Sequence, residues 1–283
     1  MSKFIMDAIW GEIEVTPFAL QFLDVYEFQR MRFMKQLGTC NFIYTCAESS
    51  RFAHSLGVYH LANRVLDVLK EKHPDIVTDR HCRLLPIAAL YHDIGHGPFS
   101  HLFDRITNTQ HEERSKKILR HVIQKYSIQG VTEKDIVFME NAISPGGYEW
   151  YNSILSSDTA DIDRMDYLVR DSHATGMSIT LNTKSVLKLI SRSCIKDGRW
   201  HFSTKVQYVV DDLLYSRRYM YDRVYLHPVT KKIEALIREA VGDDFVNCLH
   251  NLEYFLSLSD SILQDVYCRN HSPAIEKIFT RNF

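Results

Sequence analysis

Ala88–Asp104, AALYHDIGHGPFSHLFD, concentrates three histidines and two aspartates in one short segment. Neutral imidazole nitrogen and carboxylate oxygen both bind divalent ions such as Zn, Mn or Fe. Because neighbouring residues on a helix point in different directions, His92 and Asp93 reach one ion only near an irregular helix end, which the Gly95–Pro98 segment supplies. A lone His-Asp dipeptide is more often a pair of capping groups, but partners elsewhere in the chain favour a metal site. The five side chains are His92, Asp93, His96, His101 and Asp104.

The composition is that of an ordinary globular protein with a full core, since 45% of its 283 residues are hydrophobic and 24% are charged. A net charge of −1 gives no general attraction to nucleic acid or to an anionic membrane, so we expect neither as a partner. Fourteen histidines fit a metal or acid–base site, and six scattered cysteines form no disulfide framework. With no signal peptide and no apolar run long enough to span a bilayer, we expect a cytoplasmic or nuclear protein that is not secreted.

Apolar residues recur every three or four positions over most of the chain, and this periodicity predicts helices. The segment Ile9–Val15 alternates apolar and acidic residues and predicts a strand or hairpin arm, while 194–203 has an Asp-Gly turn between two short runs and predicts a hairpin. We therefore expect a single, mainly α domain with a small β-hairpin component. The expected helices span about 17–37, 51–72, 86–94, 112–126, 133–142, 148–155, 159–171, 205–225, 231–241, 245–255 and 260–267.

Two further residues are candidates to bind the same ion as the His-Asp pair. His54 lies on the apolar side of its expected helix, with Arg51 one turn before it, and a cation beside a metal ligand suits a phosphate-binding pocket. Asp163, Tyr167 and Asp171 are spaced four residues apart and share one helix face. A histidine on an apolar face is usually a packed core residue, and DIDRMDYLVRD alone also fits a solvated, salt-bridged helix. The combined spacing favours a functional site.

These segments together resemble a known family. The HD superfamily of metal-dependent phosphohydrolases has the pattern R-x-x-H, then HD, then D, which this sequence resembles. Its deoxynucleoside triphosphate triphosphohydrolases have segments similar to RFAHSLGVYHLA, LYHDIGHGPFSHLFD, QHEE and DIDRMDYLVRD of this chain. The likeness runs from about Asp7 to Tyr267. It implies the helical HD fold as one domain over 1–283, with a metal core at about 51–171 and a C-terminal part at about 205–283 that completes a nucleotide pocket.

The resemblance also implies which residues hold the metal and perform the chemistry. The ion lowers the pKa of water, and the implied reaction is attack on the α-phosphorus with release of a deoxynucleoside and intact triphosphate. His101 is the implied general acid to the leaving 5′-oxygen, Asp104 and His111 orient it, and His96 lies beside the α-phosphate. The implied metal ligands are His54, His92, Asp93 and Asp163.

Substrate contacts are implied in the same way. A triphosphate carries about four negative charges, so a nearly neutral chain must meet it with focused cations. Arg51, Arg164 and Arg217 match that role, Tyr167 adds a hydroxyl, and Mg bridges the phosphate oxygens. Arg164 replaces a lysine and Tyr221 a histidine of the animal members, which leaves the base preference open. The implied contacts to sugar and base are Gln36, Leu37, Asp171, Tyr221 and Tyr225.

Regulation and rival functions complete the expectations. Asp24 and Arg32 match a guanine-reading pair of the family's allosteric site and favour dGTP, but Met6 and Ser203 replace other residues of that site. Without a SAM domain in the sequence, we expect a compact homodimer, or a higher oligomer, that is active without a nucleotide effector. The alternatives are an HD phosphohydrolase acting on nucleoside monophosphates or signalling nucleotides, and a non-catalytic binder of nucleotides or single-stranded nucleic acid. The native metal stays open among Fe, Mn and Zn.

Overall fold

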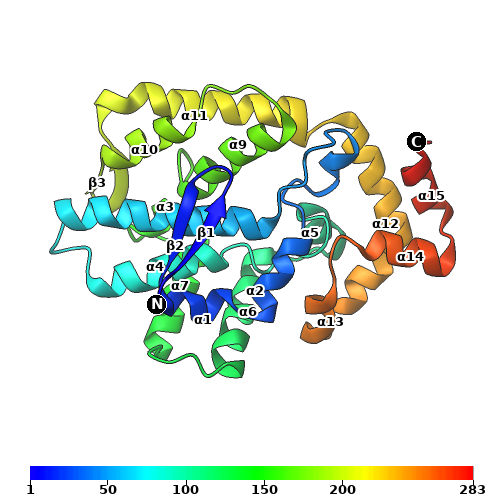
Figure 1. Ribbon diagram of the computed structural model, residues 1–283, viewed down its shortest axis with the longest axis horizontal. Coiled ribbons are helices and arrows are strands. Elements are labelled where there is room, and N and C mark those ends of the chain that lie inside the picture. Colours follow the sequence, from blue (N-terminus) through cyan, green and yellow to red (C-terminus); the bar gives the residue numbers. More distant parts are fainter. Residues whose placement is uncertain (283) are drawn as a thin grey trace.

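Two buried helices, α3 (Arg51–Lys72) and α4 (Asp79–Tyr91), pack side by side at the centre of the computed structural model, which describes residues 1–282 (Figure 1). The predicted range of α3 is confirmed, and the side chain of Ser50 caps its first turn by accepting a hydrogen bond from the Ala53 N–H. α4 begins seven residues before the predicted start, and Pro86 lies inside it. The eight residues Leu84–Tyr91 are all buried. Their packing stabilises the helical turn around Pro86, although proline removes one helical hydrogen bond.

The chain leaves α4 directly before the His-Asp pair. His92 is the C-cap of the helix, and Asp93 lies in the turn that follows. α5 (His101–Thr107) begins after this turn and was not predicted. The predicted irregular helix end is confirmed, and it allows two adjacent side chains to approach one point.

The helices that follow agree with the periodicity in position and differ at their ends. α6 (His111–Lys125) and α7 (Glu133–Ile143) match the expectations, and Thr132 caps α7. α9 (Ile162–Thr175) begins later than expected because the Asp161 side chain caps it by accepting from the Arg164 N–H. α8 (Asn152–Leu155) is shorter than predicted, and α10 (Thr183–Ser191) was not predicted.

The single N-terminal helix expected over 17–37 is wrong. The chain forms α1 (Pro17–Leu23), α2 (Tyr26–Gln29) and a 3₁₀ turn, η1 (Arg30–Phe33). Val25 is extended, with φ −116° and ψ 150°, and it is buried like the neighbouring apolar residues. The apolar spacing therefore identified core positions but not the break between the helices. A second 3₁₀ turn, η2 (Gly38–Phe42), lies within the segment expected to be a loop.

Two hairpins supply the β component. β1 (Lys3–Asp7) pairs antiparallel with β2 (Gly11–Val15), so the predicted strand begins two residues later than expected. β3 (Ser193–Lys196) and β4 (Arg199–Phe202) confirm the second hairpin. Its Asp-Gly turn has positive φ at both residues, as the tight hairpin turn requires. The predicted fold class, mainly α with a small hairpin component, is confirmed over the described residues.

The C-terminal helices cover one side of the molecule (Figure 1). The helix expected at 205–225 is a 3₁₀ turn η3 (Thr204–Val206), α11 (Gln207–Met220) and a π turn η4 (Tyr221–Tyr225). The separate helices expected at 231–241 and 245–255 are wrong, because α12 (Pro228–Cys248) runs through Gly242 and keeps Val241 and Phe245 in the core. The remaining helices are α13 (Leu252–Ser257), α14 (Ile262–Asn270) and α15 (Pro273–Thr280).

α12 packs against α5 and η2, which brings the C-terminal part to the segment that follows the His-Asp pair. The single domain expected over 1–283 stays a prediction, and its last residue, Phe283, lies outside the described part of the chain. Among the helices of residues 1–282, none combines the length and apolarity needed to cross a bilayer.

Candidate metal centre and nucleotide pocket

His54, His92 and Asp163 meet where α3, the end of α4 and α9 come together. Nε2 of His54 is 3.0 Å from Oδ1 of Asp163, and Nε2 of His92 is 3.5 Å from the same oxygen. Asp93 faces both rings, with Oδ2 at 3.5 Å from Nε2 of His54 and Oδ1 at 3.4 Å from Nε2 of His92. The structure thus brings the four predicted metal ligands around one point.

These residues fit a divalent ion. The Nε2 atoms of His54 and His92 are buried and have no hydrogen-bond partner among the described residues. The opposite ring nitrogens are held: Nδ1 of His54 is 2.7 Å from Oδ2 of Asp166, and Nδ1 of His92 is 2.7 Å from the Ala89 carbonyl oxygen. Donation from Nδ1 leaves both Nε2 lone pairs facing the carboxylates, which is how metal-binding histidines are oriented. This cluster is the place where the divalent metal expected from the sequence fits.

The electrostatics of the centre favour positive charge at its histidine rings. Burial alone lowers the pKa of the His54 imidazole, but the carboxylates of Asp163 and Asp166 raise it to about 10. Burial raises the pKa of Asp163, and the two histidines more than reverse this and lower it. Positive charge is therefore stabilised at this point, and a metal ion supplies it without a proton.

A second cluster lies directly beside the first and contains the predicted catalytic residues. The rings of His96 and His111 stack with their centres 3.7 Å apart, and the His101 ring meets His96 edge-on at 4.9 Å. Nδ1 of His111 donates to Oδ2 of Asp104 at 2.8 Å. Burial and the nearby Arg51 cation lower the pKa of His101 to about 4, so its ring is neutral near pH 7. The structure places the four residues together, and their catalytic roles stay predictions.

Arg51 connects the metal centre to the residue that precedes His101. Its buried guanidinium donates from Nη1 to Oδ2 of Asp93 and from Nε to Oγ of Ser100 at 2.9 Å. The same side chain lines the cavity described below. A cation predicted to bind phosphate therefore also orients one of the metal ligands.

The loop between the clusters is shaped by close approach and by distant arginines. A Cβ on Gly95 would lie 2.1 Å from the His111 carbonyl oxygen, so this position has no room for a side chain. Nη2 of Arg30 donates to the carbonyl oxygens of Ile94 and His96, both at 2.9 Å, and Nε of Arg114 donates to that of Gly95 at 2.8 Å. Sequence reasoning missed both arginines, because nothing in their spacing relates them to this loop.

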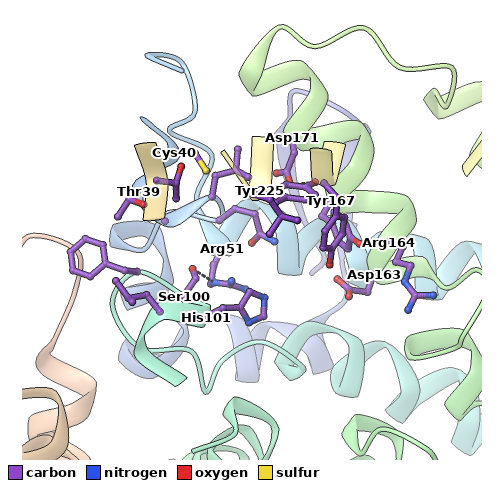
Figure 2. A pocket seen from close by; sticks show the side chains of 18 of the residues that line it. Thr39, Cys40, Arg51, Ser100, His101, Asp163, Arg164, Tyr167, Asp171 and Tyr225 are labelled. Carbon is purple, nitrogen blue, oxygen red and sulfur yellow. Dashed lines mark hydrogen bonds between the residues drawn. The ribbon is translucent and has the colours of Figure 1, made fainter. Parts of the chain in front are cut away.

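A cavity of about 450 Å³ opens beside the metal centre. Figure 2 shows Thr39 and Cys40 at one end of it and Asp163 and Arg164 at the other. Of the predicted metal ligands, Asp163 lines the cavity, and His54, His92 and Asp93 do not. All nine predicted substrate-binding residues line it: Gln36, Leu37, Arg51, Arg164, Tyr167, Asp171, Arg217, Tyr221 and Tyr225.

Tyrosines from α9 and η4 form one wall of the cavity. The Tyr225 ring meets those of Tyr221 at 5.1 Å and Tyr167 at 6.2 Å. The Tyr225 hydroxyl donates to Oδ2 of Asp171 at 2.9 Å, while burial raises the pKa of that carboxyl to about 7. The guanidinium of Arg217 lies over the Tyr221 ring at 4.8 Å. This wall combines aromatic faces with hydroxyl and carboxyl groups, which suits a sugar and its hydroxyls.

Comparison with known proteins supports the resemblance drawn from the motifs. The HD domain family model matches residues 51–171. The deoxynucleoside triphosphate triphosphohydrolase SAMHD1 homolog of Dictyostelium discoideum is 35% identical over 295 residues, covering 98% of this chain and 57% of that protein. SAMHD1 of Bos taurus is 30% identical over 318 residues, covering 93% and 54%.

A viral relative is similar to the same extent. The putative HD domain-containing protein L394 of Acanthamoeba polyphaga mimivirus is 31% identical over 265 residues, covering 84% of this chain and 57% of that protein. The chain spans about half the length of the curated relatives it matches. The resemblance drawn from the motifs is confirmed: residues 51–171 match the HD domain family, and the chain is similar over most of its length to the SAMHD1 triphosphohydrolases.

Proposed function

We propose that this protein hydrolyses deoxynucleoside triphosphates to a deoxynucleoside and inorganic triphosphate. The observation that carries the proposal is the single cavity lined by Asp163 of the metal centre together with three arginines, Arg51, Arg164 and Arg217. Its volume, about 450 Å³, is in the usual range for small-molecule sites. The names of the relatives in Dictyostelium discoideum and Bos taurus support the substrate class.

The metal would be held by His54, His92, Asp93 and Asp163. When bound, a transition ion of this kind lowers the pKa of water and neutralises phosphate charge. Two imidazole nitrogens and two carboxylates suit Fe, Mn or Zn, and we propose Mg as the ion that accompanies the triphosphate.

The chain's own residues bind the substrate and move the proton. Arg164 and Arg217 donate charge-assisted hydrogen bonds to the phosphate oxygens, and Tyr167 adds a hydroxyl. A ring nitrogen of His101 protonates the leaving 5′-oxygen, and the His111–Asp104 pair orients it. The pKa of His101 is near 4 in the free site, and the negative charge of a bound triphosphate raises it toward the working pH.

Sugar and base are read at the other side of the cavity. Asp171 and Tyr225, already joined by a hydrogen bond, contact the 3′-hydroxyl, and the Tyr225 ring crowds the 2′ position against ribose. Gln36 and Leu37 contact sugar and base. We further propose that dGTP is preferred, that activity needs no nucleotide effector, and that the working form is a homodimer.

A panel of four deoxynucleoside triphosphates with Mg and Mn tests the proposal. We expect release of inorganic triphosphate without added effector, and loss of at least about a thousandfold in the Asp163→Ala variant, which removes a metal ligand. The exposed Asp158→Ala, five positions earlier, is the matched control and should retain activity. Release of orthophosphate or pyrophosphate instead would assign a different phosphohydrolase, and strict dependence on added GTP or dGTP would refute the effector-free part.

A further inference from the structure

The turn that precedes His101 has an unfavourable backbone. Phe99 and Ser100 have φ of 59° and 61°, in the left-handed region that costs ordinary residues about 1 kcal/mol or more each. His101 follows directly as the first residue of α5. Contacts from outside the turn must therefore hold the backbone that presents this ring to the cavity.

One carboxylate from the C-terminal part holds the turn. Asp260, between α13 and α14, accepts the Phe99 N–H with Oδ1 and the Lys35 N–H with Oδ2, both at 2.8 Å. Oγ of Ser100 donates to the Lys35 carbonyl oxygen at 2.9 Å and accepts from Nε of Arg51 at 2.9 Å. The carboxylate thus joins the turn to the backbone at Lys35, and Ser100 joins the turn to Arg51 of the cavity.

The two amides need a two-oxygen acceptor at this place, because a buried backbone N–H left without a partner is destabilising. Burial raises the pKa of Asp260 to about 6, and hydrogen bonds from the two N–H groups act in the opposite direction. The Lys35 ammonium is directed to Glu48, with its Nζ 3.0 Å from Oε2, so the carboxylate's described hydrogen bonds come from the backbone. A charged group is kept here at a desolvation cost.

The same C-terminal segment also supports the first half of the loop. The Phe255 ring lies over the guanidinium groups of Arg30 at 4.9 Å and Arg114 at 5.6 Å. Those arginines hold the carbonyl oxygens of residues 94–96. α13 therefore contacts the arginines that hold residues 94–96, and Asp260, which follows α13, holds Phe99.

We infer that Asp260 is a positioning residue for the reaction: by holding the Phe99–Ser100 turn, it sets the place of the His101 ring against the substrate. The inference rests on the proposed function. It gives the C-terminal part a role in proton donation at a distance from the metal.

Kinetics of Asp260→Asn test the inference, with the exposed Asp265→Asn on α14 as matched control. We expect kcat to fall about tenfold to a hundredfold with KM within about threefold of wild type, because a small misplacement of a reacting group has effects of this size. Bound metal per chain should be unchanged. In a His101→Ala background, Asp260→Asn should cause little additional loss of kcat, since both changes act on one step.

Hydrogen exchange gives a readout that does not depend on activity. In Asp260→Asn, the amides of Phe99 and Lys35 should exchange about tenfold faster, and those of Asp265→Asn should match wild type. If the wild type hydrolyses no deoxynucleoside triphosphate, the proposed function fails even if exchange behaves as expected. Unchanged kcat and exchange in Asp260→Asn, equal kcat losses with and without His101, or loss of bound metal would each overturn the inference.

Discussion

The metal centre and the loop of residues 94–100 lie side by side but are built in different ways. At the metal centre, His54 and Asp163 extend from regular helices, and the position of each on its helix sets the direction of its side chain. The loop has little regular structure, and its carbonyl and N–H groups are held by Arg30, Arg114 and Asp260 from three distant parts of the chain.

The comparison teaches where local sequence is informative. A side chain on a helix has a direction that follows from its position, so ligands at the right spacing can be recognised in advance. A loop that closes against other segments depends on partners whose identity is decided only when the chain folds. We therefore expect substitutions at the metal centre to change metal binding, and those around the loop to change turnover.

Among residues that are not metal ligands, Asp166 should have the largest effect on metal affinity. It contacts His54 on the side of the ring that faces away from the other ligands. Its Oδ2 is 2.7 Å from Nδ1 of His54, and it also pairs with Arg170 and accepts from the Trp10 indole at 2.5 Å. Asp166→Asn removes the charge that keeps the proton on Nδ1, and such changes typically lower metal affinity about 10- to 100-fold. Metal competition with a chelating dye measures this.

Asp158→Asn, exposed and before the same helix, should bind metal like wild type. Thermal unfolding of the metal-free proteins checks that Asp166→Asn is folded. If its metal affinity equals that of wild type, the carboxylate serves only to pack Arg170, and His54 is directed by its helix alone.

A smaller effect is expected from the arginines that are proposed to bind phosphate. Their substitution should weaken substrate binding and leave metal binding unchanged. Arg217 lines the cavity and Arg218, next on α11, is exposed and does not. Arg217→Met should raise KM about tenfold, the usual effect of one lost hydrogen bond to a charged group, without change in bound metal. Initial rates over a range of dGTP concentrations give KM and kcat separately.

Arg218→Met serves as the control and should have the KM of wild type. A fall in kcat alone in Arg217→Met would place the arginine in the transition state rather than in substrate binding. A loss of metal would show that cavity and metal centre are not separable.

The same distinction explains what the sequence predicts and what it does not. His54 and Asp163 are candidates because of their positions on helix faces, and the resemblance implies the full ligand set with His92. The structure brings these three side chains together. Asp260 was not, because its partners at Phe99 and Lys35 are backbone groups that leave no side-chain pattern. The prediction of one helix across Val25 and of two helices separated near Gly242 fails for a related reason. Apolar spacing indicates which residues are buried, whereas tertiary packing decides whether a helix continues.

Outside the site, the Asp135 carboxylate on α7 combines both kinds of support in one side chain, because it has local partners in its own turn and distant partners, Arg80 and Arg83, on α4. Asp135 accepts from the Thr132 N–H at 3.0 Å within the first turn, and from Nε of Arg80 on α4 at 2.8 Å. Burial raises the pKa of Asp135, and the bond from Arg80 together with those from Thr132 lowers it to about 2. A carboxyl whose folded-state pKa lies below its unfolded value stabilises the protein above the unfolded pKa, near 3.8, and loses that contribution as pH falls toward 2.

Asp135→Asn should therefore lower the free energy of unfolding by about 1 kcal/mol at pH 7, a value reduced from the full shift because Arg80 is partly solvated. Urea unfolding at pH 7, 5 and 3.5 measures it, and the gap to wild type should stay constant to pH 5 and narrow at pH 3.5. Arg80→Met keeps the local capping bonds and should cost less than Asp135→Asn at pH 7. A gap that does not change with pH would show that shape rather than charge matters at this turn, and an equal cost in Arg80→Met would mean that the distant partner, not the local cap, sets the start of α7.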